Sequence, residues 1–237
     1  MYYYGFDWTY VVLVLPFAIL AMWASFNVNS TFKKYNNQFS VRGITGADAA
    51  ARVLRANGVS GVRIERVSGN LTDHFDPKSN VIRLSDSVYS STSTAAIGVA
   101  CHEAGHAVQY AQEYSPMKLR AAIIPITRIG SMLAMPLILL GTVLHVMENV
   151  SFVFVYVGLA CFGTSLLFQL VTLPVEFNAS ARAMEAIRGS GMLSDNEAKG
   201  ARKVLTAAAL TYVAAAAVSL AQLLRLVLLF AGRSRDD

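Results

Sequence analysis

Charged side chains are scarce in this chain, and cysteine and histidine are scarcer still. Asp, Glu, Lys and Arg together make up 15% of the 237 residues, and there are two cysteines and four histidines. Two cysteines give no disulfide framework, and no glycine-rich phosphate loop is present. No basic patch with interleaved aromatic residues occurs either, so a nucleic-acid partner is not expected. The net charge of +5 therefore needs another explanation.

Apolar residues, by contrast, are abundant. They make up 54% of the chain, and the mean hydropathy of +0.45 is too high for an ordinary soluble domain of this length. Four charge-free runs are long enough to span a bilayer: 9–26, 129–147, 150–175 and 204–224. Glu148 and Asn149 alone separate the second run from the third, which predicts a tight transmembrane hairpin. Because Arg225 follows the last run, three arrangements are open for it: a tilted span, a helix packed against the other helices, or a helix partly in the interface.

Basic residues near the run ends predict the orientation in the cell membrane. One face carries eight of them: Lys33, Lys34, Lys118, Arg120, Arg182, Arg188, Arg202 and Lys203. By the positive-inside rule this face is cytoplasmic and the N-terminus is outside. Arg233 and Arg235 would lie on the opposite side if the last run crosses fully. Basic loops facing anionic headgroups account for the net charge.

The longest polar portion, residues 27–120, is expected to form an α+β unit. Thr45 resembles the cap of a helix that ends before Asn57-Gly58. Residues 62–67 and 81–84 read as strands, with His74 in a polar turn between them. An exposed strand edge could hold an extended peptide, or the strands could simply complete the fold.

The predicted organisation therefore has five parts. They are an N-terminal transmembrane anchor (1–26), the cytoplasmic α+β portion (27–120), a transmembrane hairpin (121–175), a cytoplasmic helical segment (176–203) and a C-terminal transmembrane helix with its tail (204–237). The predicted fold class is an α-helical multi-pass membrane protein with about four transmembrane helices and a small zincin-like α+β catalytic portion.

The sequence His-Glu-Ala-Gly-His at 102–106 is the most informative motif. On a helix, residues four apart share a face, so His102 and His106 can bind one ion while Glu103 reaches a water on it. Apolar neighbours on both sides predict that this helix is buried. The alternative is a chance motif whose histidines are satisfied by hydrogen bonds.

Few residues can supply a third metal ligand. His145 lies deep in an apolar run, and His74 fits a solvated loop as well as a cleft. Glu176 follows the predicted hairpin, so it emerges on the membrane face that carries the motif. Zinc sites with two histidines and one glutamate are a known catalytic class. Glu176 is therefore the preferred third ligand.

Three segments carry a resemblance to a known family: DHFDPKSNVIRLS, HEAGHAVQ and LPVEFNASARA. In this order, with a hairpin between the last two, they resemble the bacterial YugP-type membrane-bound neutral zinc metallopeptidases, and the likeness covers most of the chain. More distantly, the chain is similar to the membrane gluzincins that include the heat-shock membrane protease and the CAAX prenyl protease. The resemblance implies a zinc endopeptidase with His102, His106 and Glu176 as ligands.

One position departs from the gluzincin pattern. Where those enzymes commonly place an aspartate that orients a ligand histidine, four residues after the glutamate, this chain has Ser180. The aspartate's role is therefore not carried over, although Ser180 or Asn178 could contact a ligand.

The predicted function is a zinc metalloendopeptidase with one Zn²⁺ per chain, in which Glu103 acts as general base and then as proton donor to the leaving amine. From placement alone, His74, Asn178 and Arg182 are candidates to stabilise the oxyanion. Arg182 lies roughly 120° around the helix from Glu176, which weakens its claim.

The expected partners are polypeptide substrates, membrane proteins among them, and the lipid bilayer. Two other classes of function were considered. A catalytically inactive, metal-stabilised membrane scaffold or adaptor would not need Glu103. A transporter or channel would need polar residues within several spans, and Gln169 and Gln222 are the main ones.

Overall fold

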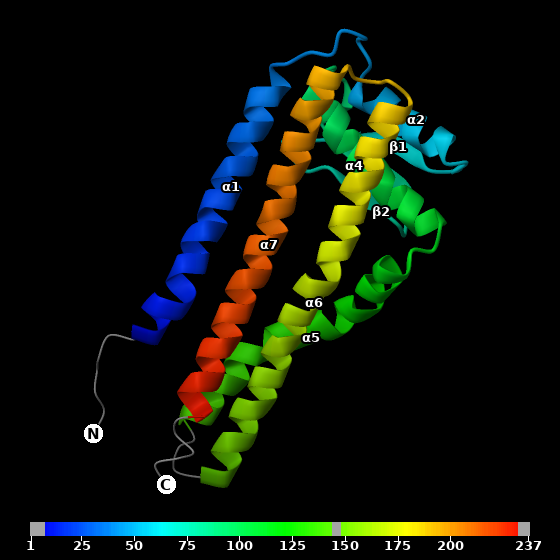
Figure 1. Cartoon of the computed structure of the whole chain (residues 1–237). Helices are drawn as coiled ribbons and strands as arrows, with labels where there is room; N and C mark the ends of the chain where they lie inside the picture. The colour runs from blue at the N-terminus through cyan, green and yellow to red at the C-terminus, as the bar shows by residue number, and fades with distance from the viewer. Residues whose placement is uncertain (1–7, 144–147, 232–237) are drawn as a thin grey trace. The chain divides into compact units, whose positions relative to one another are not determined.

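The structure, a computed structural model, describes residues 8–143 and 148–231. Long helices dominate it, and a small three-stranded sheet precedes the helix that carries the motif (Figure 1). Within these described residues, four helices are long and apolar enough to cross a membrane: Tyr10–Asn36, Ser115–Val143, Phe152–Gly189 and Asp195–Phe230. The predicted class, an α-helical membrane protein with a small α+β portion, is confirmed.

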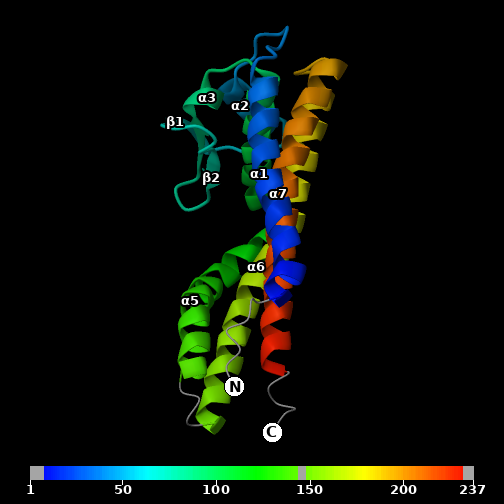
Figure 2. The same cartoon turned by 90° about the vertical axis from the view of Figure 1, so that its left-hand side faces the viewer.

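In chain order the elements are the π-helix η1 (Tyr10–Val14), α1 (Leu15–Asn36), α2 (Gly46–Ala56), β1 (Arg63–Val67), β2 (His74–Asp76), β3 (Val81–Ser85), α3 (Asp86–Tyr89), α4 (Thr94–Ala111), α5 (Ser115–Val143), α6 (Glu148–Gly189) and α7 (Asp195–Ala231). The chain divides into two compact units. The mixed unit comprises residues 24–118 and 173–211, and the helical unit lies within 1–23, 119–172 and 212–237. Helices α1, α5, α6 and α7 each continue from one unit into the other (Figures 1 and 2).

In the mixed unit, helix α2 begins with the cap predicted from the sequence. The side chain of Thr45 accepts a hydrogen bond from the backbone N–H of Asp48 (3.1 Å), and the Asp48 carboxylate accepts one from the backbone N–H of Thr45 (3.4 Å). This capping box satisfies two amides that have no partner in the helix ladder. The helix then buries Val53 and Leu54, and Gly58 takes a positive φ of 67° just after its end.

The sheet has the strand order β1-β3-β2, with β3 in the centre. β1 runs parallel to β3 and β2 runs antiparallel to it, with His74 opposite Arg83. His74–Asp76 is thus an edge strand, and the prediction that His74 sits in a turn was wrong. Three residues are too few to show the alternation by which strands are recognised.

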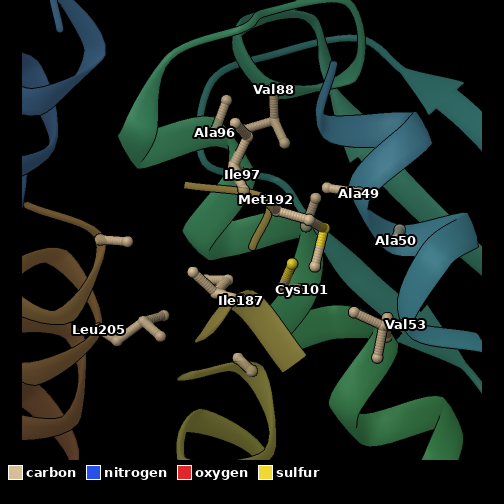
Figure 3. Close-up of a cluster of buried hydrophobic side chains, with 14 of the residues drawn as sticks. Ala49, Ala50, Val53, Val88, Ala96, Ile97, Cys101, Ile187, Met192 and Leu205 are labelled. Carbon is tan, nitrogen blue, oxygen red and sulfur yellow. The ribbon is translucent and has the colours of Figure 1, made fainter. Parts of the chain in front are cut away.

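The core of the mixed unit is built around α4. Side chains from α2, α3, α4, α6 and α7 and from the α6–α7 connection gather there (Figure 3). Ile97 and Cys101 of α4, Val53 of α2, and Ile187 of α6 are all within 1% of complete burial. Each large apolar side chain buried in this way contributes roughly 1.5–3 kcal/mol to folding. Helix α4 is therefore held in place from several directions.

In the helical unit, α5 and α6 pack through glycine. A Cβ atom on Gly130 would lie 2.9 Å from the carbonyl oxygen of Cys161, and one on Gly158 would lie 3.0 Å from that of Ala134. Only glycine permits so close an approach of two backbones, and membrane helices use it widely for that purpose.

Several helices extend beyond the apolar runs that predicted them. α5 begins at Ser115 and α7 at Asp195, each well before the corresponding run, and Glu176 lies inside α6 although the sequence suggested a helix start there. Apolar runs report contact with lipid, whereas a helix ends where its backbone is capped or broken. Pro174 does not interrupt α6.

The predicted hairpin turn also needs correction. Glu148 and Asn149 belong to α6. His145 and the rest of 144–147 lie outside the described residues. The predicted domain boundaries stay predictions.

Candidate metal centre

Helix α4 presents the motif from a buried position. Its first turn is capped by Ser93, whose hydroxyl accepts a hydrogen bond from the N–H of Ala96 (3.1 Å) and donates one to Oδ1 of Asn36 at the end of α1 (2.8 Å). Farther along, Glu103 and His106 are each only 8% exposed. The predicted burial of this helix is confirmed.

Helix α6 approaches the backbone of α4 closely at Gly105, between the two histidines. A Cβ atom at this position would lie 2.8 Å from the carbonyl oxygen of Ala179, so a larger residue would push the helices apart. Glu176 lies almost one turn before Ala179. The close approach therefore brings the Glu176 carboxylate to the face of α4 that carries His102 and His106.

The structure brings together the three residues predicted as ligands. Nε2 of His102 and Nε2 of His106 lie 3.3 and 3.5 Å from the same carboxylate oxygen of Glu176, and the three possible ligand atoms all lie within 4.8 Å of one another. Two ligands held about 2.0–2.1 Å from one zinc ion at the tetrahedral angle are separated by roughly 3.3–3.4 Å. These residues therefore fit a zinc ion in both spacing and donor chemistry, and they leave a position for water.

Each histidine has a partner on its other ring nitrogen. Nδ1 of His102 lies 3.1 Å from the hydroxyl of Ser180, and Nδ1 of His106 lies 3.0 Å from Oε1 of Gln109. Such outer contacts orient the ring so that Nε2 faces the ion. Ser180 thus makes one of the two contacts predicted from the sequence, whereas the contact of Gln109 with His106 was not predicted.

The acidic groups affect the protonation of their neighbours. Burial disfavours the charged form of His106, but its hydrogen bond to Glu176 and the charges of Glu103 and Glu176 outweigh this effect and raise the pKa of His106. Burial also raises the pKa of Asp73, against two hydrogen bonds from Ser85 that lower it, and the charge of Glu103 adds to the rise. Asp73 is thus within electrostatic reach of Glu103.

The remaining predicted residues have defined partners. Nδ1 of His74 lies 2.8 Å from the carbonyl oxygen of Thr72, and when protonated it donates a hydrogen bond to that oxygen. Oδ1 of Asn178 accepts hydrogen bonds from Gln109 (2.9 Å) and from Nε of Arg182 (2.7 Å). Nη1 of Arg182 also donates to Gln112 (2.7 Å). Arg182 is engaged across the two helices, and oxyanion stabilisation by any of these residues stays a prediction.

Sequence reasoning also missed the strand beside the helix that carries the motif. β2 packs against α4, and the rings of Phe75 and Tyr110 lie 5.8 Å apart between their centroids. The available signal was the pair of turn-forming segments on either side of His74–Asp76, which leaves room for a short strand between them.

Comparisons with known proteins show the family to which the chain belongs. The family model described as "putative neutral zinc metallopeptidase" matches residues 10–231. A protein of Bacillus subtilis (strain 168) named "Putative membrane protease YugP" is 46% identical to this chain over 228 residues, which cover 96% of this chain and 99% of that protein. No solved structure matches the chain.

Proposed function

Because the chain belongs to this family of neutral zinc metallopeptidases, we propose that it is a membrane-embedded endopeptidase that binds one Zn²⁺ through His102, His106 and Glu176. The observation that carries the proposal is the convergence of both Nε2 atoms on one oxygen of Glu176, at 3.3 and 3.5 Å. A chance motif gives no reason for a carboxylate 70 residues downstream of His106 to meet both rings.

Glu103 is the residue proposed for proton transfer. A zinc ion in this site would supply a Lewis acid that polarises the peptide carbonyl and acidifies water. Glu103 follows His102 directly, so its carboxylate can accept a proton from that water and return it to the leaving amine. Its burial limits competing solvent and strengthens its interactions with the reacting atoms.

The edge strand β2 is the proposed site for the substrate backbone. β3 occupies one edge of β2, and β2 pairs with no other of the described strands. Because β2 packs against α4, a peptide that extends the sheet along its other edge would lie beside the motif helix. Main-chain hydrogen bonds bind a polypeptide with little regard to its sequence, so soluble peptides and extended segments of membrane proteins both qualify as substrates.

The proposed orientation places the metal centre at the cytoplasmic face. It rests on the eight basic residues that the positive-inside rule assigns to that face. Reporters fused to the full chain test it: a reporter that is active only outside the cell should report activity at the N-terminus and none in the α6–α7 connection. The reverse pattern would put the metal centre outside.

The catalytic proposal is tested on the detergent-purified full chain. Zinc content and cleavage of casein or a peptide are compared among the wild type, Glu103→Gln and Glu176→Ala, with Glu185→Gln as the control because Glu185 is an exposed glutamate of α6. We expect Glu103→Gln to retain zinc and lose cleavage, Glu176→Ala to lose zinc, and the control to resemble the wild type.

Other outcomes would support different conclusions. Zinc binding combined with cellular function that does not require Glu103 would favour a metal-stabilised scaffold or adaptor. Zinc retained in Glu176→Ala would remove Glu176 from the ligand set. A wild-type protein that binds no zinc would overturn the proposal.

A further inference from the structure

Gln109 is a fully buried polar residue located almost one turn after His106 on α4. Its exposed fraction is 0%, and a buried amide is costly unless its hydrogen bonds are made. Both the oxygen and the nitrogen of this amide have hydrogen-bond partners. Nε2 donates to the carbonyl oxygen of Val175 (2.8 Å) and to Oδ1 of Asn178 (2.9 Å), and Oε1 faces Nδ1 of His106. Gln109 therefore joins a metal-ligand histidine on α4 to the turn of α6 that carries Glu176.

The Val175 carbonyl determines which way the amide points. A carbonyl oxygen can only accept, so the group that meets it must be the NH₂ of Gln109, and Oε1 is left facing His106. Oε1 can also only accept, so Nδ1 of His106 must carry the proton. When the ring is neutral, Nε2 then has the free lone pair, and Nε2 is the atom that lies near Glu176.

The same amide fixes the position of Glu176. Val175 and Asn178 flank Glu176 on α6. The carbonyl oxygen of Val175 and Oδ1 of Asn178 both accept a hydrogen bond from Nε2 of Gln109. Asn178 is itself held by Arg182 (2.7 Å), so its oxygen cannot easily turn away. One side chain thus bonds to the ring of His106 and also links α4 to the turn of α6 that carries the carboxylate.

His102 is held differently. Its partner, the hydroxyl of Ser180, can rotate and can either donate or accept, so it does not fix the protonated nitrogen. The two histidines of the motif are therefore not equivalent in how firmly they are oriented.

We propose that Gln109 is a positioning residue for the zinc site, and that zinc affinity depends on both the acceptor and the donor ends of its amide. The inference rests on the proposed zinc ligands but does not require peptidase activity. It adds a residue of α4, outside the ligand and catalytic set, to those on which the metal site depends.

Two variants separate the ends of the amide. Gln109→Glu keeps an oxygen for His106 but replaces the NH₂ with an acceptor that faces two other acceptors, Val175 and Asn178. Gln109→Met keeps a similar shape and loses both functions. We expect zinc affinity of the full chain in detergent, measured by competition with a chromophoric chelator, to fall about 10- to 100-fold in each. The visible spectrum of the Co²⁺-loaded protein should change as well, because the ligand geometry is altered.

The matched control is Gln112→Met. Gln112 is an exposed glutamine at the C-cap position of the same helix, just after Ala111, and it bonds to Arg182, not to a proposed ligand. Its zinc affinity should stay within about twofold of wild type, as for other surface substitutions. A merely structural role for Gln109 would lower the unfolding temperature of the metal-free protein and leave the zinc affinity of the folded protein unchanged.

The outcomes distinguish this inference from the proposed function. Zinc affinity of Gln109→Met within about twofold of the control would overturn the inference alone. Should Gln109→Met fail to fold, Gln109→Glu and Asn178→Ser provide the same comparison, and unchanged affinity in both has the same meaning. A wild type that binds zinc without cleaving peptides would contradict the peptidase and leave the positioning role intact. A wild type that binds no zinc would overturn both.

Discussion

Gly105→Ala is the substitution for which the structure gives the clearest magnitude. The added Cβ would lie 2.8 Å from the carbonyl oxygen of Ala179, whereas carbon–oxygen contacts normally begin at roughly 3.3 Å. The obstacle is helix backbone, which cannot rotate away as a side chain would. Relief therefore requires α6 to move about 0.5 Å from α4 at this point, and metal–ligand distances tolerate only about 0.2 Å.

The displacement should lower zinc affinity more than stability. Overpacking costs typically 1–3 kcal/mol, but alanine is favoured over glycine inside a helix by about 0.8–1.0 kcal/mol, so the net loss of unfolding free energy is partly offset. Zinc binding has no such offset, because the ion requires the original ligand spacing. The strain of 1–3 kcal/mol corresponds to about 5- to 150-fold weaker binding.

The assay compares Gly105→Ala with Gly98→Ala in the full chain. At Gly98 the nearest atom to an added Cβ is the Ala201 methyl at 3.3 Å, so Ala201 would have to move by only a few tenths of an ångström. We expect Gly98→Ala to bind zinc within about twofold of wild type, by chelator competition. A folded Gly105→Ala protein that binds zinc as tightly as the Gly98→Ala control would refute the reasoning that this close approach places Glu176.

Three further predictions concern single side chains. Burial raises the pKa of Cys101 to about 12. At pH 8 its thiol should therefore not be alkylated by iodoacetamide in the native protein, and it should be alkylated after unfolding, as measured by mass spectrometry. Equal rates of alkylation in both states would contradict its burial. Hydrogen bonds from Ser79, Arg83 and the Lys78 amide hold the pKa of Asp76 well below its ordinary 3.8. Its ionised carboxylate therefore stabilises the β2–β3 hairpin above pH 3.8, and this stabilisation is lost as the pH falls below that value. In Asp76→Asn, the protection of the hairpin amides from hydrogen exchange should depend less on pH in the acid range. An unchanged pH dependence would refute the role given to Asp76. Ser180→Ala should weaken zinc binding about tenfold, measured by chelator competition, and no change would show that the Ser180 hydroxyl does not orient its histidine.

The sequence was sufficient to predict that the three proposed ligands lie together, because their pattern follows from helix geometry and chain topology. Two histidines four residues apart share a face in any α-helix, and a buried helix could be expected from the apolar residues around them. Glu176 followed from counting membrane runs, since a hairpin returns the chain to the side that it left. The structure gives these three residues the expected proximity, and their role as ligands awaits the zinc measurement.

The contacts that orient the ligands could not be predicted in the same way. Ser180 reaches His102 from another helix, and Gln109 also bonds to α6. The close approach of α4 and α6 at Gly105 is a tertiary contact that no local sequence pattern encodes. One signal was nevertheless available: a glutamine in a buried helix, three residues after a histidine of the motif, must have its hydrogen bonds satisfied nearby. The short strand β2 was missed because three residues carry no periodicity.

The position of Glu176 in the chain constrains how the protein can cross a membrane. His106 precedes α5, and Glu176 follows the apolar part of α6, yet their side chains lie 3.5 Å apart. A bilayer core is about 30 Å thick, so an odd number of crossings between the two residues would put them on opposite sides. Two helices in this interval are long and apolar enough to cross, and two crossings satisfy the requirement. The end of α1 is tied to the start of α4 by the bond between Asn36 and Ser93, which places it on the same side. If α1 and α7 each cross once, the N-terminal end of α1 and the C-terminal end of α7 lie on the membrane face opposite the candidate metal centre, whichever face that centre occupies.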